Sequence, residues 1–204
     1  EVTGYSNHGA GLAALVVEQQ ADREFRRLAD DELFWPLGMA RTHYGPLEDL
    51  TGLATGYLCQ ASECRPAPTL GSQVYPAGFA YTTAADMGRF IAAQLGTDSI
   101  PALTAAVRAL LGARQAGHRP DIPGMALGFF EQRWRGVSLL THSGMAPGFN
   151  ALLVIVPTRR VGFFLAANGG RSTIRCCPCC SNRLHPPSHP ISPSRSRHTR
   201  ATTR

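Results

Sequence analysis

The stretch THSGMAPGFNALLVIVPTRRVGFFLAAN, residues 141–168, decides the fold class that this 204-residue chain predicts. It holds two short apolar runs, and the Pro147-Gly148 pair before the first of them is typical of a turn. Two similar runs come directly before, so the four runs are residues 127–134, 137–142, 149–157 and 160–168. Short apolar runs separated by turn residues are typical of strands that pair with their neighbours in sequence. Region 123–172 therefore predicts an antiparallel meander.

The region before these strands, residues 1–122, predicts helices and loops. Apolar residues recur at helical spacing in four segments, and caps or breakers bound three of them. The segments are residues 11–20, residues 22–33 before Pro36, a helix capped by Thr83 and Asp86, and a helix through Leu103 and Leu111 that Gly112 ends. Residues 40–80 show no sustained period, and Tyr5 to Gly9 resembles a turn, so both are expected to be loop. Helices followed by strands predict an α+β fold.

The charge of the chain is unevenly distributed. The net charge is +6, but residues 1–170 hold 13 Arg against 14 Asp and Glu, and residues 171–204 hold 7 Arg and no acid. A basic surface on the folded part, which nucleic-acid binding would need, is therefore not expected. No apolar run approaches the roughly 18 residues of a membrane-spanning helix. All 20 basic residues are Arg, and the chain contains no Lys.

The last segment, residues 173–204, is a low-complexity tail of Cys, Pro, Ser and Arg. Such a composition cannot bury enough apolar surface to order itself, so we expect disorder. Its CCPCC run, residues 176–180, lies near His185 and His189 and offers a zinc-binding alternative. The spacing fits the usual C-x₂₋₄-C pairs poorly, so no metal site and no cofactor are expected. The Arg residues offer a non-specific nucleic-acid alternative. The abrupt change of texture is also typical of a shifted reading frame or a mis-spliced end.

Two short motifs carry candidate chemistry. Tyr5 and Asn7 form a Tyr-x-Asn motif, in which a phenol becomes a useful base only when nearby cations stabilise the phenolate. His142 and Gly144 stand where an apolar run ends, and the backbone N–H of Met145 follows them as a possible oxyanion donor. Taken singly, each motif is more common as an ordinary turn or as a hydrogen-bonded, half-buried histidine. Cys59 and Cys64 can pair or stay free, because spacing alone leaves both open.

Together and in order, these motifs and their surroundings resemble the serine β-lactamase and penicillin-binding-protein family. The branch in question includes class C β-lactamases, D-aminopeptidases and esterases. The resemblance covers residues 1–172. It rests on the phrases YSNHGAGLAALVVE (5–18), LFWPLGMARTHY (33–44), PAGFAYTTAADMGRFIAAQL (76–95), HSGMAPGFNALLVIVP (142–157) and RVGFFLAANGG (160–170).

The resemblance implies part of the β-lactamase/DD-peptidase fold and acyl transfer through a serine. It implies that Tyr5 relays a proton, Asn7 contacts the substrate and His142 is an electrostatic partner of the substrate. Gly144 would leave space for the substrate, and Met145 N–H would stabilise the oxyanion. The substrate implied is a small molecule or peptide with an amide or ester bond. A His in place of the family's Lys favours esterases or peptidases over dedicated β-lactamases.

The departures from the family are equally informative. The family's nucleophile motif is Ser-x-x-Lys, and a chain without Lys cannot contain it. The strands and helices that precede Tyr-x-Asn in the family, and its closing helix, are also not recognised. We therefore expect an incomplete fold with uncovered apolar faces, inactive by itself. The alternatives are a non-catalytic relative that binds peptidoglycan-like or peptide ligands, and a functional tail. Compartment and oligomeric state stay open.

Overall fold

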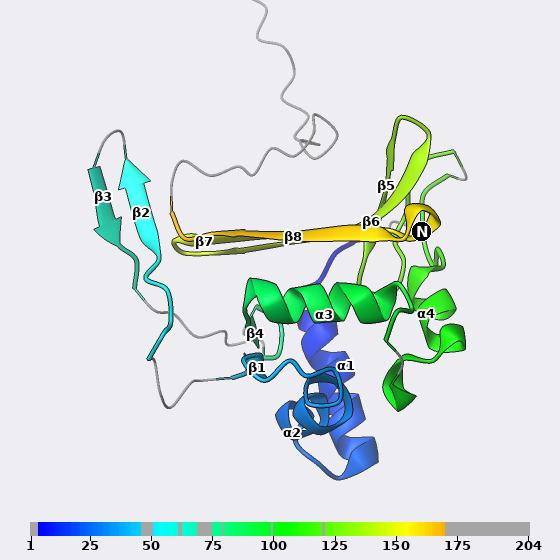
Figure 1. Ribbon diagram of the computed structural model, residues 1–204, viewed down its shortest axis with the longest axis horizontal. Coiled ribbons are helices and arrows are strands. Elements are labelled where there is room, and N and C mark those ends of the chain that lie inside the picture. The colour runs from blue at the N-terminus through cyan, green and yellow to red at the C-terminus, as the bar shows by residue number, and fades with distance from the viewer. Residues whose placement is uncertain are drawn as a thin grey trace, which may run out of the picture. The chain divides into compact units, whose positions relative to one another are not determined.

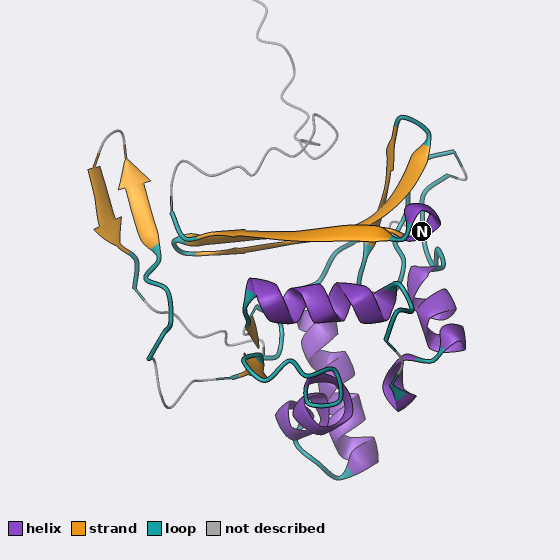
Figure 2. Ribbon diagram, viewed as in Figure 1, coloured by secondary structure: helices purple, strands orange, loops and turns teal. Residues whose placement is uncertain are grey.

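The computed structural model describes residues 4–45, 51–60, 63–68, 75–78, 80–98, 100–119 and 121–169. The chain divides into a unit of Glu1–Ile174 and a second unit of Arg175–Arg204. The second unit lies outside the described residues, and so does the boundary predicted after residue 172. The predicted disorder and the zinc alternative therefore fall on residues that the structure does not describe. In the described part, helices precede an antiparallel sheet, which confirms the α+β prediction (Figure 2).

The sheet has four strands in the order β5-β6-β7-β8, and every neighbouring pair is antiparallel. The predicted meander is therefore confirmed. Its strands are β5 (Phe130–Trp134), β6 (Val137–Ala146), β7 (Phe149–Val156) and β8 (Val161–Ala167). Pro147 and Gly148 close the hairpin between β6 and β7, and Gly148 has a φ of +76°, which glycine adopts without strain.

Helix α3 (Ala84–Gln94) lies along one face of this sheet, and Figure 1 shows α1 and α2 on the same side. Its Ile91 packs with Leu153 and Ile155 of β7 in one apolar cluster. Its Ala93, fully buried, belongs to a second cluster with Phe34 and other residues around α2. Helix α3 thus joins the sheet to the first helices by burying apolar residues on both sides.

Helix α1 (Asn7–Ala21) begins earlier than the sequence predicts, so the expectation of a loop through Gly9 is wrong from Asn7 onward. The reason is Ser6, whose hydroxyl accepts a hydrogen bond from Gly9 N–H at 3.0 Å and caps the helix. At its other end Asp22 adopts the left-handed conformation, with φ of 50°, which stops the helix. The prediction that the next helix starts at residue 22 is therefore wrong.

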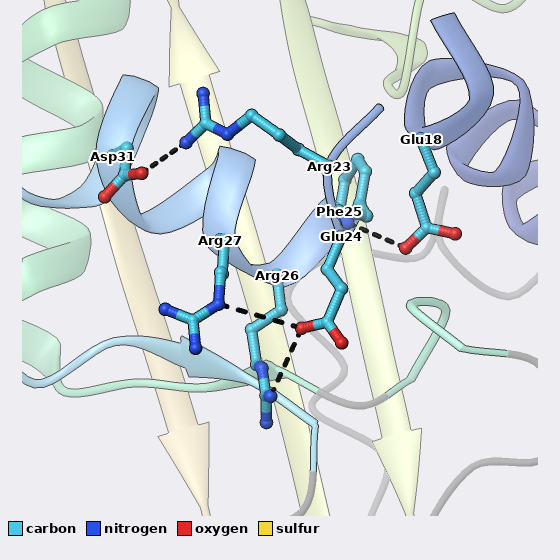
Figure 3. Close-up of polar contacts among 7 residues, drawn as sticks. All are labelled: Glu18, Arg23, Glu24, Phe25, Arg26, Arg27 and Asp31. Carbon is cyan, nitrogen blue, oxygen red and sulfur yellow. Dashed lines mark hydrogen bonds and ion pairs between the residues drawn. The ribbon is translucent and has the colours of Figure 1, made fainter. Parts of the chain in front are cut away.

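The next helix, α2 (Phe25–Ala29), continues directly into a π-helical turn, η1 (Asp30–Phe34). Figure 3 shows how α1 and α2 are joined: Glu18 accepts a hydrogen bond from Phe25 N–H at 2.7 Å. This contact satisfies one of the N–H groups that the first turn of α2 leaves without a helical partner. An ion pair between Arg23 and Asp31 also links the α1–α2 connection to η1 (Figure 3).

Residues 40–80 contain short strands that the sequence analysis missed. The pairs are β1 (His43–Tyr44) with β4 (Ala80–Tyr81), and β2 (Tyr57–Gln60) with β3 (Glu63–Pro66). Every residue of β2 and β3 except Cys59 is exposed, so the alternating apolar pattern that reveals a strand is not present. Cys59 and Cys64 face each other and form a disulfide, which resolves the alternative left open above.

The last two helical segments are η2 (Pro101–Leu103), a 3₁₀ turn, and α4 (Ala105–Gly112). Leu103 therefore precedes the helix predicted to include it, because Thr104 caps α4 by accepting from Val107 N–H at 3.3 Å. The stop at Gly112 and the cap of α3 by Thr83, which accepts from Asp86 N–H at 3.2 Å, agree with the sequence. None of the helices in the described ranges is long and apolar enough to cross a membrane.

Apolar side chains on two elements are exposed. On α1 they are Leu12, Leu15, Val16 and Val17, and on β8 they are Val161, Phe163 and Leu165. Single exposed apolar residues are ordinary, whereas several on one element give it an apolar surface in contact with solvent.

The carboxylate of Asp86 ties α3 to the segment before β1. It is 3% exposed, and its Oδ2 accepts from Arg41 N–H at 2.8 Å and from the Thr42 hydroxyl at 2.9 Å. Its Oδ1 pairs with Arg89 at 3.1 Å. A buried carboxylate is tolerated only when it is hydrogen-bonded in this way.

We predict that Asp86→Ala lowers the free energy of unfolding by about 2–4 kcal/mol, because the buried Thr42 hydroxyl and the partly buried Arg41 N–H lose their acceptor. Urea unfolding followed by circular dichroism measures this change. The matched control is Asp98→Ala, since Asp98 is exposed, and it is expected to leave the midpoint within error. Equal midpoints for the two variants would contradict the role given to Asp86.

Candidate active site

His142 lies within β6, not at the end of a strand as the sequence suggested. Strand β6 continues through Gly144 and Met145 because these residues pair with Ala151 and Asn150 of β7. The His142 ring is half-buried. Burial lowers the pKa of His142 below its ordinary value, and a backbone hydrogen bond with Ser143 opposes this shift. The imidazole is therefore neutral at pH 7.

Tyr5 lies beside His142, although the two residues come from opposite ends of the described chain. Their ring centroids are 6.0 Å apart. Tyr5 directly precedes Ser6, so the cap that starts α1 also positions the backbone of Tyr5. Tyr5 is 56% exposed, which leaves its hydroxyl accessible to a ligand. The pair brings a phenol and a neutral imidazole together, and both groups can donate or accept a proton.

A third ring, that of Phe130, contacts both of these residues. Its centroid is 5.7 Å from Tyr5 and 5.8 Å from His142. The sequence does not single out Phe130, because a phenylalanine in an apolar run predicts a core residue.

The other predicted site residues lie on α1 and β6. Asn7 is the first residue of α1, and its side chain is exposed. Gly144 and Met145 follow His142 along β6, and Met145 is 83% exposed. A Cβ built on Gly144 would meet only Ala151 Cβ at 3.7 Å, an ordinary contact distance. The protein itself therefore does not need glycine at this position, and the space beside it is open.

A cavity of about 460 Å³ lies next to this end of β6. Its walls are the β6–β7 turn and the β2–β3 hairpin, through Tyr57, Leu58, Cys59, Met145, Ala146, Pro147, Gly148, Asn150 and Gly169. The base of the hairpin is fixed to the sheet, because Tyr57 N–H donates to Asn168 O at 2.9 Å. A Cβ on Gly148 would lie 2.7 Å from Tyr57 N, so this close approach requires glycine.

No cluster of His, Cys, Asp or Glu suited to a metal ion occurs among the residues that the structure describes.

Comparison with known proteins identifies the family. The profile of the beta-lactamase family matches residues 1–174. The chain belongs to the beta-lactamase family. The human protein "Putative beta-lactamase-like 1" is 30% identical over 170 residues, which are 78% of this chain and 32% of that protein. The chain therefore spans about a third of its human relative.

Solved structures agree with this family fold. The octameric penicillin-binding protein homologue from Pyrococcus abyssi matches with a TM-score of 0.71 and 18% identity, over 82% of this chain and 39% of that chain. A class C beta lactamase from Rhodobacter sphaeroides matches with a TM-score of 0.71 and 17% identity, over 83% of this chain and 56% of that chain. The predicted membership of the β-lactamase and penicillin-binding-protein family is confirmed, and so is the predicted fold class.

The disulfide of this beta-lactamase family chain supports one wall of the cavity. Because the hairpin is nearly all exposed, few apolar contacts hold it, and the Cys59–Cys64 bond constrains it instead.

We predict that the double variant Cys59→Ser/Cys64→Ser increases amide hydrogen exchange of Tyr57 and Leu58 by about tenfold or more, because a short-loop disulfide contributes about 2 kcal/mol. Exchange measured by NMR tests this. Amides of Leu152 and Ile155 in β7 serve as internal controls and are expected to be unchanged. Unchanged exchange in the hairpin would show that other contacts hold it.

Proposed function

We propose that this chain provides the proton-relay and oxyanion-binding side of a serine acyl-transfer site, in a protein that hydrolyses an amide or ester bond. The observation that carries the proposal is the contact between Tyr5 and His142, with ring centroids 6.0 Å apart. Membership of the beta-lactamase family supports a hydrolytic reaction of this class.

In such a reaction a serine attacks the carbonyl carbon, the carbonyl oxygen gains negative charge, and the leaving group takes up a proton. The Tyr5 hydroxyl delivers that proton. The backbone N–H of Met145, a residue that is 83% exposed, stabilises the oxyanion, and the open space at Gly144 lets the substrate approach the strand. Asn7, on the first turn of α1 near Tyr5, donates an amide hydrogen bond to the substrate.

His142 sets the electrostatics of the proposed site. A neutral imidazole offers hydrogen bonds but no full positive charge, since burial lowers its pKa. It therefore recognises polar groups of a substrate more weakly than the ammonium of a lysine recognises a carboxylate. This difference favours an ester or peptide substrate over a dedicated β-lactam substrate.

The nucleophile is not among these 204 residues in the form that the family uses, because Ser-x-x-Lys needs a lysine. We therefore propose that the chain by itself forms no acyl-enzyme. The same fact supports a second candidate function, a non-catalytic relative that binds peptide or peptidoglycan-like ligands. The cavity of about 460 Å³ beside Met145 has the size of a small-ligand site.

Covalent labelling separates the two candidates. We predict that fluorescent penicillin and fluorophosphonate give no adduct on the 204-residue chain. A longer protein that contains this chain and an in-frame Ser-x-x-Lys is expected to be labelled. In that protein Tyr5→Phe should slow labelling by about 10²- to 10⁴-fold, the usual contribution of a general acid or base.

Gly144→Ala tests the same site in that longer protein, because the added methyl group fits the protein and obstructs only the ligand. We expect slower labelling at unchanged stability. The matched control is Gly88→Ala, where a Cβ would meet nothing within 4 Å. Reversible binding without any adduct on the longer protein would favour the non-catalytic candidate and contradict the proposed hydrolase.

A further inference from the structure

We propose that Phe130 is a positioning residue of this site, which holds the Tyr5 and His142 rings against each other. This inference rests on the function proposed above, because it gives the aromatic contact a role in acyl transfer. Phe130 itself touches no reacting atom and acts through the two residues that do.

The three rings form a nearly equilateral triangle. The centroid distances are 5.7 Å for Tyr5–Phe130, 5.8 Å for Phe130–His142 and 6.0 Å for Tyr5–His142. Both contacts of Phe130 have the same tilt, with interplanar angles of 35°. Distances between 4.5 and 7 Å with tilted rings are those at which aromatic pairs attract. Each ring therefore contacts the other two, and removal of one leaves a single pair.

Phe130 is held in the sheet at the start of β5. It is the first residue of β5 and pairs with Thr141, the residue next to His142. The Thr141 hydroxyl donates to Phe130 O at 3.3 Å, and Phe130 also forms a bridge with Met125. These contacts therefore fix the backbone of Phe130, from which its ring extends.

Tyr5 is held less firmly. It precedes α1, outside any regular element, and it is 56% exposed. Its ring contacts Phe130 and His142, which lie on the neighbouring strands β5 and β6. We infer that the Phe130 ring, which is anchored in the sheet, restricts the motion of the Tyr5 ring. The Tyr5 hydroxyl therefore stays near the position where a leaving group needs a proton.

Phe130 also affects the chemistry of His142. Its ring centroid lies 5.8 Å from that of the half-buried imidazole, and burial is the main cause that lowers the pKa of His142. Among the described residues, the groups that contact this imidazole include the Tyr5 and Phe130 rings and the backbone of Ser143. The ring of Phe130 thus favours the neutral form, in which one ring nitrogen accepts a hydrogen bond and the other donates one.

A purely structural role is the competing explanation, and the neighbouring residue illustrates it. Phe129 is 7% exposed and packs in the apolar cluster with Ile91 and Leu153. Phe130 is only half-buried, and within the described part of the chain its ring contacts the rings of both candidate site residues, Tyr5 and His142. Phe129 is therefore a core residue, and Phe130 is the proposed positioning residue.

The test is an NMR titration of His142 in the 204-residue chain, with the resonance assigned by its loss in His142→Gln. We expect Phe130→Leu to raise the His142 pKa toward its ordinary value, and Phe130→Tyr to restore the low value. Phe163→Leu is the matched control, because Phe163 is an exposed phenylalanine of β8, and it should change nothing. An unshifted His142 pKa in a folded Phe130→Leu chain would overturn the proposal.

The second readout is the rate of fluorophosphonate labelling in the longer protein that carries Ser-x-x-Lys. Phe130→Leu should slow labelling at least tenfold, and Phe130→Tyr should recover most of the rate. An unchanged rate in a protein that does label would overturn the positioning role, whatever the titration shows. If neither the wild-type longer protein nor any variant is labelled, the proposed hydrolase function is contradicted instead. The titration then still decides whether Phe130 affects the pKa of His142.

Discussion

The register of β6 against β7 is the constraint on which the rest of the site depends. The pairing runs from Leu140 opposite Ile155 to Ala146 opposite Phe149, and it directs His142 toward one face of the sheet. A slip of one residue would turn every side chain of β6 to the opposite face. The short turn at Gly148 and the burial of Ile155 against α3 oppose such a slip.

The helices matter to the site because they bring Tyr5 to this sheet. Helix α3 contributes to both apolar clusters, and through them the sheet and the first helices form one folded unit. Asp86 adds a buried polar tie, and Glu18 fixes the corner between α1 and α2. The candidate site therefore combines a residue just before the first helix with residues of the sheet, within one folded unit. This arrangement explains how residues far apart in sequence share one set of ring contacts.

Local sequence patterns predicted the parts of the fold that local physics controls. The meander, the cap at Thr83 and the stop at Gly112 follow from apolar spacing and capping chemistry. The β2–β3 hairpin was missed because a disulfide and backbone contacts stabilise it, and neither leaves an apolar pattern. The closeness of Tyr5 and His142 followed only from the family resemblance, since no spacing rule relates them. Phe130 was missed because its contacts with two rings distant in sequence leave no local pattern.

The most direct test of this account is the nuclear Overhauser effect between the ring protons of Tyr5 and His142 in the isolated 204-residue chain. Centroids 6.0 Å apart place some protons of the two rings close enough for a cross-peak. We predict that the cross-peak is present, and that it disappears together with the native signals of β6 and β7 in urea. A folded sheet with native β6–β7 cross-peaks but none between Tyr5 and His142 would contradict the account.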